Sequence, residues 1–122
     1  MIRKPSFFFM LLILVLVLPV YADECVEGNC VNGTGTMRYD NGFRYTGEFR
    51  DGRRNGQGVY FGRGGSRYEG QFLDGRFHGK GTYYPQEGKV AYRGDWKNGK
   101  RSGQGISYFD NGAVEYSGEW SF

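Results

Sequence analysis

The sequence predicts an all-β fold, a single elongated antiparallel meander of stacked β-hairpins that follows a signal peptide. A pattern of glycines and aromatic residues recurs from Tyr45 at spacings of 23, 24 and 24 residues. Dipeptides typical of tight turns separate short segments with alternating side chains, which favours hairpins. After residue 22 the chain has only seven Ile, Leu or Val residues. These are too few for a conventional two-layer core, so the buried side chains must be mainly aromatic.

Residues 1–22 are typical of a secretory signal peptide. Arg3 and Lys4 precede an apolar run from Phe7 to Leu18, and small or neutral residues lead to a cleavage site after Ala22. The alternative is an uncleaved membrane anchor, but a spanning helix needs ~20 apolar residues and this run is shorter. We therefore expect a secreted or periplasmic protein that begins at Asp23.

Removal of this segment would leave a nearly neutral chain. Without Arg3 and Lys4 the formal net charge falls from +3 to +1, because 14 basic residues then face 13 acidic ones. Nucleic-acid-binding domains carry a marked positive charge, so nucleic acid is not an expected partner. One His and two Cys are also too few for most metal sites. No metal and no cofactor are expected.

Residues 23–44 are predicted to be a degenerate repeat that caps the array. Cys25 and Cys30 flank the turn Glu27-Gly28-Asn29, and the register places Cys25 in the aromatic column described below. In an oxidising compartment this pair is expected to form a disulfide that pins the first hairpin. A loop this short gives about 2 kcal/mol by the chain-entropy relation. A redox pair is the alternative, although redox cysteines are usually separated by two residues.

Three full repeats and a half repeat follow the cap. Their shared pattern is Tyr-x-Gly-x-aromatic-x-x-Gly-x-x-x-Gly-x-Gly. In a strand, alternate residues share a face, so the Tyr, the first Gly and the aromatic residue point the same way. The Asp-Gly or Asn-Gly dipeptide that follows predicts a hairpin turn. A glycine on the aromatic face leaves room for a ring from a neighbouring strand. The repeats span residues 45–67, 68–91, 92–115 and 116–122.

This motif resembles the MORN repeat (membrane occupation and recognition nexus), whose pattern is Tyr-x-Gly-x-Trp-x-x-Gly-x-x-x-Gly-x-Gly. The similarity extends from about Gly33 to Trp120, with Phe49 and Phe72 where Trp is usual. The resemblance implies a ladder of β-hairpins, and in cytoplasmic MORN proteins basic residues are associated with acidic phospholipids. Leucine-rich repeats have a similar period but need regular leucines. Choline-binding repeats also combine glycines and aromatic residues but lack the paired Gly-x-Gly.

The expected function is a non-enzymatic scaffold for protein–protein interaction or self-association. The aromatic column on one sheet face is the candidate partner-binding face, because a single sheet cannot cover it completely. The final half repeat lacks its hairpin mate, so its open edge could pair with a strand of another chain. The partner would be another protein or a second copy. The column consists of Tyr45, Phe49, Tyr68, Phe72, Tyr92, Trp96, Tyr116 and Trp120.

The alternative function is binding of acidic lipid headgroups or envelope glycans by the basic turns and the ring faces. Asp51 and Asp74 dilute the positive charge of these turns, and a secreted protein does not meet the anionic cytoplasmic leaflet. A solvated edge that discourages strand-to-strand aggregation is the simpler interpretation. The candidate headgroup contacts are Arg53, Arg54, Arg76, Lys100 and Arg101.

No set of residues in the sequence predicts catalysis. His78 has Asn55 and Ser102 as its repeat equivalents, which indicates a solvent-facing turn position without a linked nucleophile. Acidic residues recur at one position of the motif, but adjacent repeats separate them by ~9–10 Å on an open face. We expect solvated cross-strand charges there. This column contains Glu48, Gln71, Asp95 and Glu119.

Overall fold

The computed structural model describes residues 13–14 and 22–121 of the chain, so the predicted signal peptide lies almost entirely outside the described residues. The described part contains one nine-stranded sheet in which the spatial order of the strands is their sequence order. All neighbouring strands are antiparallel, which confirms the predicted meander. The strands are β1 (Glu24–Gly28), β2 (Gly33–Arg38), β3 (Arg44–Arg50), β4 (Arg53–Phe61), β5 (Arg67–Leu73), β6 (Arg76–Tyr84), β7 (Tyr92–Lys97), β8 (Lys100–Tyr108) and β9 (Val114–Trp120).

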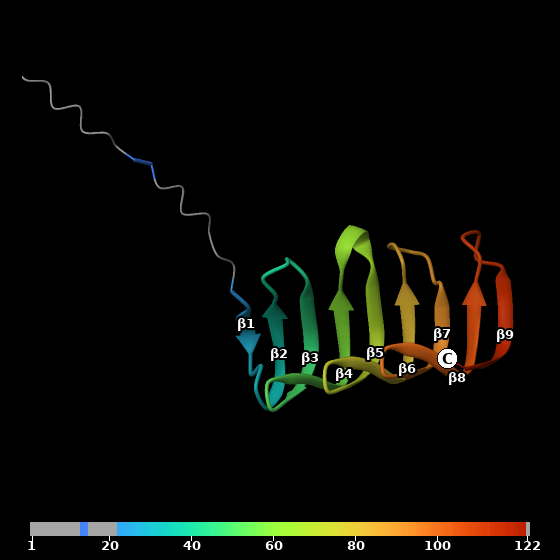
Figure 1. Cartoon of the computed structure of the whole chain (residues 1–122), viewed down its shortest axis with the longest axis horizontal. Helices are drawn as coiled ribbons and strands as arrows, with labels where there is room; N and C mark the ends of the chain where they lie inside the picture. The colour runs from blue at the N-terminus through green and yellow to red at the C-terminus, as the bar shows by residue number, and fades with distance from the viewer. Residues whose placement is uncertain (1–12, 15–21, 122) are drawn as a thin grey trace, which may run out of the picture.

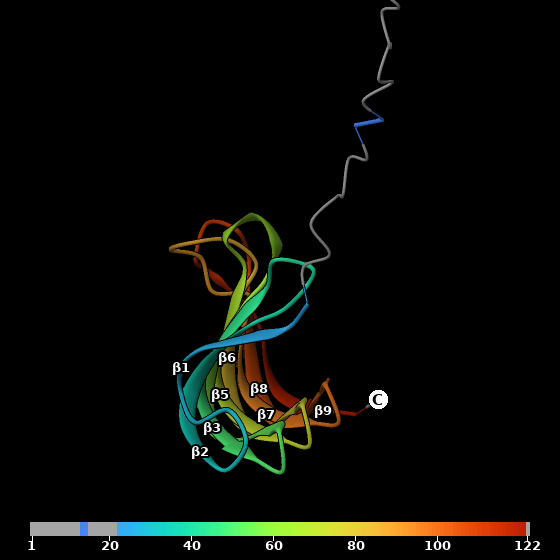
Figure 2. The same ribbon diagram turned by 90° about the vertical axis from the view of Figure 1, so that its left-hand side faces the viewer.

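The sheet is a curved row of strands with β1 at one end and β9 at the other (Figure 1). Figure 2 looks along this row and shows the strands behind β1 curving, so the sheet is a trough rather than a flat slab. Tight turns after β3, β5 and β7 form one rim, which we call the turn rim. The loops after β2, β4, β6 and β8 form the other, the loop rim. The loop after β4 includes a short 3₁₀ turn, Arg63–Gly65.

The turn rim follows from the Asp-Gly and Asn-Gly dipeptides. Asp51 has a φ of 50° and Gly52 a φ of 74°, so both central residues of the turn are left-handed. This is the conformation of the type I′ turn, whose twist matches that of the flanking strands. The same pair of positive φ values recurs at the two later turns, which confirms the predicted hairpins.

A bulge lies near the tight turn of each of the hairpins β3–β4, β5–β6 and β7–β8, and bends the hairpin there. Gly47 pairs with Gly58, but Phe49 pairs with Arg54, so β4 uses four residues where β3 uses two. Gly56 occupies the extra length with a φ of 82°. The second strand of each hairpin begins directly after the turn, three residues before the Gly-x-Gly, because a bulged strand continues through the irregularity.

The core is aromatic, as predicted. The Tyr45 ring makes edge-to-face contacts with Phe49 of its own repeat and Phe72 of the next, each with 5.0 Å between ring centroids. Such a pair contributes about 0.5–1.5 kcal/mol beyond the area it buries. Every further repeat adds equivalent contacts, so the core is a continuous file along the sheet. It consists of Cys30, Tyr45, Phe49, Tyr68, Phe72, Tyr92 and Trp96.

The Cys25–Cys30 disulfide is confirmed and joins residues whose Cα atoms lie 5.9 Å apart. The prediction that Cys25 belongs to the aromatic column is wrong. Cys25 is exposed on the edge strand β1, and Cys30 is the half-cystine that packs against the core. The first hairpin is shorter than the later ones, because Gly28 pairs with Gly35 seven residues on, whereas Gly47 pairs with Gly58 eleven residues on. Cys30, two residues after Gly28, therefore takes the position that Phe49 has after Gly47.

Candidate functional site

Most of the predicted partner-binding face is core. Of the eight aromatic residues in the column, the two in β9 retain accessible surface. Tyr116 is 46% exposed and Trp120 is half-buried. The other six side chains of the column are buried, so they offer no surface to a partner. The buried members are Tyr45, Phe49, Tyr68, Phe72, Tyr92 and Trp96, all at most 7% exposed.

Each buried tyrosine is fixed by its hydroxyl group and by two glycines. Tyr68 donates a hydrogen bond to the backbone oxygen of Gln71 at 2.8 Å. Its hydroxyl oxygen lies over Gly70 and Gly81, where an added Cβ would be only 2.9 and 2.2 Å away. Burial of the ring raises the pKa of Tyr68 above its ordinary value. The same hydrogen bond, glycine contacts and raised pKa recur at Tyr45 and Tyr92.

A second aromatic row packs against this core and is only partly buried. All of its rings except Tyr39 border a pocket of about 400 Å³ near the loop rim. Tyr60 and Tyr83 lie two residues after Gly58 and Gly81, and the Tyr60 ring contacts Phe77 edge to face with 6.4 Å between centroids. Because alternate residues of a strand share a face, counting two residues on from those glycines would have placed both tyrosines on the aromatic face. The second row consists of Tyr39, Phe43, Tyr60, Phe77 and Tyr83.

The polar column has a structural role at the bulges. Each of its first three side chains accepts a hydrogen bond from the backbone N–H that follows the bulged glycine of the next strand. Because this N–H has left the ladder, the side chain supplies the partner it would otherwise lack. The pairs are Glu48 with Gln57, Gln71 with Lys80, and Asp95 with Gln104.

Asp95 is the most strongly held member of this column. Its Oδ1 lies 2.9 Å from the Lys80 ammonium nitrogen, and its Oδ2 accepts the Gln104 N–H at 3.0 Å. These two hydrogen bonds, with the Lys80 contact the larger cause, lower the pKa of Asp95. Glu119 in β9 instead accepts a hydrogen bond from the Gln104 side chain at 3.0 Å.

The predicted basic turn residues divide into two groups. The Arg54 guanidinium lies over the Tyr60 ring at 4.7 Å and donates to the Gly75 backbone oxygen at 2.7 Å. The Arg101 guanidinium lies over Tyr92 at 4.9 Å. These two arginines are therefore bound to the protein's own core. Exposed side chains make up the second group, which is Arg53, Arg76 and Lys100.

The third hairpin carries the densest positive charge of the turn rim. Lys97 and Lys100 are directly opposite each other in the strand register. With Arg76 and Arg101 they line a shallow pocket of about 350 Å³, which no acidic side chain lines. The turn residue here is Asn98, where the first two hairpins have an aspartate. Like charges directly opposite each other are destabilising, so an anion in this pocket would relieve their repulsion.

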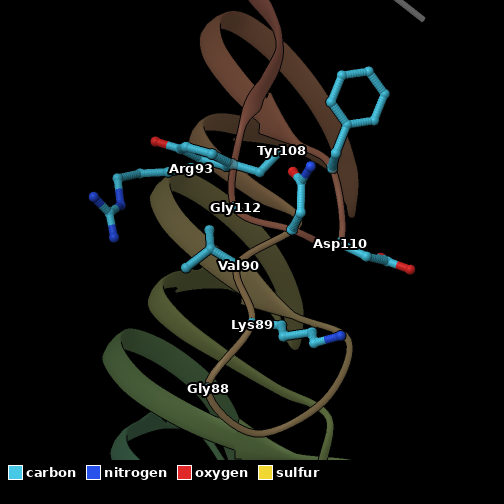
Figure 3. A pocket seen from close by; sticks show the side chains of 9 residues that line it. Gly88, Lys89, Val90, Arg93, Tyr108, Asp110 and Gly112 are labelled. Carbon is cyan, nitrogen blue, oxygen red and sulfur yellow. The ribbon is translucent and has the colours of Figure 1, made fainter.

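A further pocket of about 380 Å³ lies at the loop rim, between the loops that follow β6 and β8. Figure 3 shows that Arg93 and Tyr108 point to one side of it, while Lys89 and Asp110 point to the other. Lys89 and Asp110 therefore lie on the same side although their charges are opposite, and Arg93 lies on the other, so no group of one charge converges on the pocket. This pocket does not single out a ligand class.

The remaining candidate is the edge strand β9. Within the described residues it has one strand neighbour, β8, at the end of the row seen in Figure 1. Tyr116 donates to the Glu119 backbone oxygen at 2.8 Å and contacts Trp120 edge to face, as in every earlier repeat. Unlike the earlier tyrosines, Tyr116 has no ring of a following repeat over it in the described part of the chain. Tyr116 therefore has the hydrogen bond and the first ring contact of the earlier tyrosines but not, within the described residues, the second ring that buries them.

The family model of the MORN repeat matches residues 45–67, 68–88 and 92–114, which together are more than half of the chain. The chain belongs to the MORN repeat family. MORN repeats are a non-enzymatic repeat type that is generally involved in binding proteins or membrane lipids. Comparison with curated proteins found no match.

Other features of this MORN protein are structural. His78 was predicted to face solvent, but it is half-buried, and its buried Nδ1 has no hydrogen-bond partner among the residues that the structure describes. Its equivalent Asn55 is buried and accepts the Asp74 N–H at 3.2 Å, which links neighbouring hairpins. Among residues 13–14 and 22–121, no three His, Cys, Asp or Glu side chains are grouped to hold a metal ion. Nor does this part of the chain contain a helix long and apolar enough to span a bilayer.

Proposed function

We propose that this MORN protein is a secreted or periplasmic interaction scaffold that associates with a second copy of itself through the edge strand β9. One observation carries the proposal. Tyr116 is 46% exposed, whereas its equivalents Tyr45, Tyr68 and Tyr92 are at most 1% exposed. The protein buries this ring in every repeat that is followed by another strand, so the same burial is available to a strand that adds to β9.

The geometry of the core explains what such a strand would contribute. Tyr92 contacts Trp96 of its own repeat at 5.0 Å and Trp120 of the following one at 5.3 Å between ring centroids. Tyr116 has the first contact, to Trp120 at 5.2 Å. An added strand would cover the exposed ring and would also pair with the backbone groups along the outer side of β9. Both are the usual sources of affinity in β-strand addition.

The opposite edge of the sheet is less suited to pairing. β1 has five residues and contains an irregularity between Cys25 and Glu27. Short strands, bulges and charged residues are the features by which sheets avoid edge-to-edge association. The disulfide further fixes β1 in a shape set by its own turn. Association is therefore expected at β9 and not at β1.

The proposed location rests on two features of the chain. The N-terminal segment has the basic start, the apolar run Phe7–Leu18 and the small residues before Ala22 that export signals share. The Cys25–Cys30 disulfide is the form that these cysteines keep in an oxidising compartment. Intact-mass measurement of protein recovered outside the cytoplasm, with and without reductant, tests both features: loss of residues 1–22 and a two-hydrogen difference are expected.

Self-association is tested by size-exclusion chromatography with light scattering, on protein expressed from the full chain so that any processing takes place. The expected mass is that of two copies at micromolar concentration. Tyr116→Lys places a charge on the edge and should give monomers. Phe109→Lys is the matched control, because Phe109 is a similarly exposed ring (51%) on the loop rim. A wild-type chain that is monomeric throughout, or a Tyr116→Lys chain that stays dimeric, contradicts the proposal.

Binding of acidic lipid headgroups is the second candidate function. The observation that favours it is the pocket at the third hairpin, where Lys97 and Lys100 face each other beside Arg76 and Arg101. Co-sedimentation with phosphatidylglycerol vesicles at low and high salt tests it, because contacts between exposed charges weaken as ionic strength rises. The double change Lys97→Glu and Lys100→Glu should abolish binding. Lys89→Glu, on the opposite rim, should not, and equal effects of both variants would argue against a site here.

A further inference from the structure

One glycine in each of the nine strands lies on a single line across the sheet. Each of these residues is the direct register partner of the next, so the row is unbroken from β1 to β9. Every neighbouring pair of strands in the described chain is thus aligned glycine to glycine. The row is Gly28, Gly35, Gly47, Gly58, Gly70, Gly81, Gly94, Gly105 and Gly118.

The row exists because the core tyrosines lie on it. A Cβ on Gly58 would be 2.4 Å from the Tyr45 ring, and a Cβ on Gly105 would be 2.1 Å from the Tyr92 hydroxyl oxygen. Each tyrosine therefore uses a glycine of its own strand and one of the strand that follows. Tyr116 has the first of these in Gly118, where an added Cβ would be 2.8 Å from the Tyr116 hydroxyl oxygen. A following strand that completes its site needs a glycine opposite Gly118.

We propose that the second copy supplies this glycine itself: two β9 strands pair antiparallel with Gly118 opposite Gly118 of the partner subunit. This inference rests on the proposed self-association and assigns its register. A twofold axis passes through the glycine pair, so both copies use the same residues, as a closed dimer requires. The glycine row continues from one copy into the other. Each Tyr116 ring lies towards the space that the partner's Gly118 leaves because it has no side chain.

The neighbouring positions also fit this register. Tyr116 is placed opposite the partner's Trp120, and Ser117 opposite the partner's Glu119. Aromatic pairs are favourable across antiparallel strands, and a serine hydroxyl can donate a hydrogen bond to a carboxylate. The twofold register centred on Ser117 would instead place Glu115 opposite the partner's Glu119, and like charges directly opposite each other are destabilising. Charge and glycine alignment therefore select the same register.

Cysteine pairing between two different chains tests the register. Residues directly opposite have Cβ atoms about 4.5–5.5 Å apart, close to disulfide distance, whereas diagonal neighbours are at about 7–8 Å. A Ser117→Cys chain mixed with a Glu119→Cys chain should form a covalent dimer under mild oxidation, several-fold more than either chain alone. The native cysteines do not interfere, since Cys25 and Cys30 are paired with each other.

The matched control is Thr46→Cys mixed with Glu119→Cys. Thr46 occupies the position of Ser117 in the first full repeat and is exposed, but it lies on the interior strand β3. No covalent dimer is expected from this mixture. Efficient coupling of the Ser117→Cys chain with itself would overturn the proposed register in favour of the one centred on Ser117. Dimers seen by light scattering without coupling in the mixed sample would also overturn it, while leaving self-association intact. A monomeric wild-type chain would remove both.

Discussion

The Tyr68 and Phe77 rings lie parallel, with 3.8 Å between centroids and an angle of 4° between their planes. The repeat equivalents of Phe77 are Arg54 and Arg101, whose flat guanidinium groups also lie over aromatic rings. What the position requires is a planar group over the core, and positive charge is incidental. This is why two of the five basic residues predicted to contact headgroups are structural.

Removal of the Phe77 ring should therefore cost more than its replacement by arginine. Phe77→Ala is expected to destabilise the protein by about 2–3 kcal/mol, less than the ~3–5 kcal/mol of a fully buried Phe because this ring is half-buried. Phe77→Arg restores a planar group and should recover most of the loss. Urea denaturation followed by circular dichroism measures both. Equal destabilisation by the two substitutions would show that the flat stacking surface is unimportant.

Gly81 should tolerate no side chain. A Cβ at this position would be 2.2 Å from the Tyr68 hydroxyl oxygen and 2.3 Å from the ring, and overpacking of this kind costs about 1–3 kcal/mol. Gly81→Ala is expected at the upper end of that range, because the ring is held by its hydrogen bond. Gly62→Ala is the control, since its Cβ would meet no ring and only the Ser66 hydroxyl at 2.7 Å, whose rotation would cost one exposed hydrogen bond to the Arg63 backbone oxygen. Thermal melts of both variants give the comparison.

Stability should fall in alkaline solution. Burial raises the pKa of Tyr45, Tyr68 and Tyr92 in the folded protein, whereas an unfolded chain ionises tyrosine at about pH 10. The contribution of these rings is therefore complete below about pH 10 and is lost as the pH rises further. Urea midpoints measured across this range should decline. Tyrosinate absorbance should show late titration of these three rings and of Tyr60, whose pKa burial also raises, while the fold persists. Titration of all tyrosines together near pH 10 would refute the assignment.

Ser107 is expected to be a site where the natural residue costs stability. It is 1% exposed, and its Oγ is buried without a hydrogen-bond partner in the described chain. An unsatisfied buried hydroxyl costs about 1–3 kcal/mol. Ser107→Ala should therefore raise the free energy of unfolding, by about 1 kcal/mol after loss of some packing. Its repeat equivalents are the large rings Tyr60 and Tyr83, so a serine is not a requirement of this position in the repeat. A decrease in stability would mean that the hydroxyl is satisfied.

The repeat pattern was sufficient to predict the meander, the hairpin turns, the aromatic core and the disulfide. Each of these depends on interactions within one repeat or between neighbours. Asp51-Gly52 specifies its turn locally, and Tyr45 meets Phe72 because the spacing of 23 residues brings equivalent strands together. Because the same pattern recurs in every repeat, these relationships can be predicted from the sequence alone.

The bend of the strands was not predictable in the same way, and it changed the candidate site. The bulge at Gly56, like its equivalents in the later repeats, bends its hairpin around the aromatic column. The rings of the column are thereby buried, whereas Tyr60 and its neighbours in the second aromatic row stay partly exposed. Alternation alone treats the strand as flat, so it assigned the buried column to the surface. The hydrogen bonds that side chains at the Glu48 position accept from backbone N–H groups at the bulges were missed for the same reason.

The strictly sequential order of the strands has a consequence for how the chain is made. Each strand pairs with the one next to it in the sequence, so no hairpin has to wait for a distant part of the chain. A hairpin can close as soon as its two strands leave a ribosome or a translocation channel, and the next then grows on it. The length of unpaired chain at risk of aggregation at any moment is about one repeat of 24 residues.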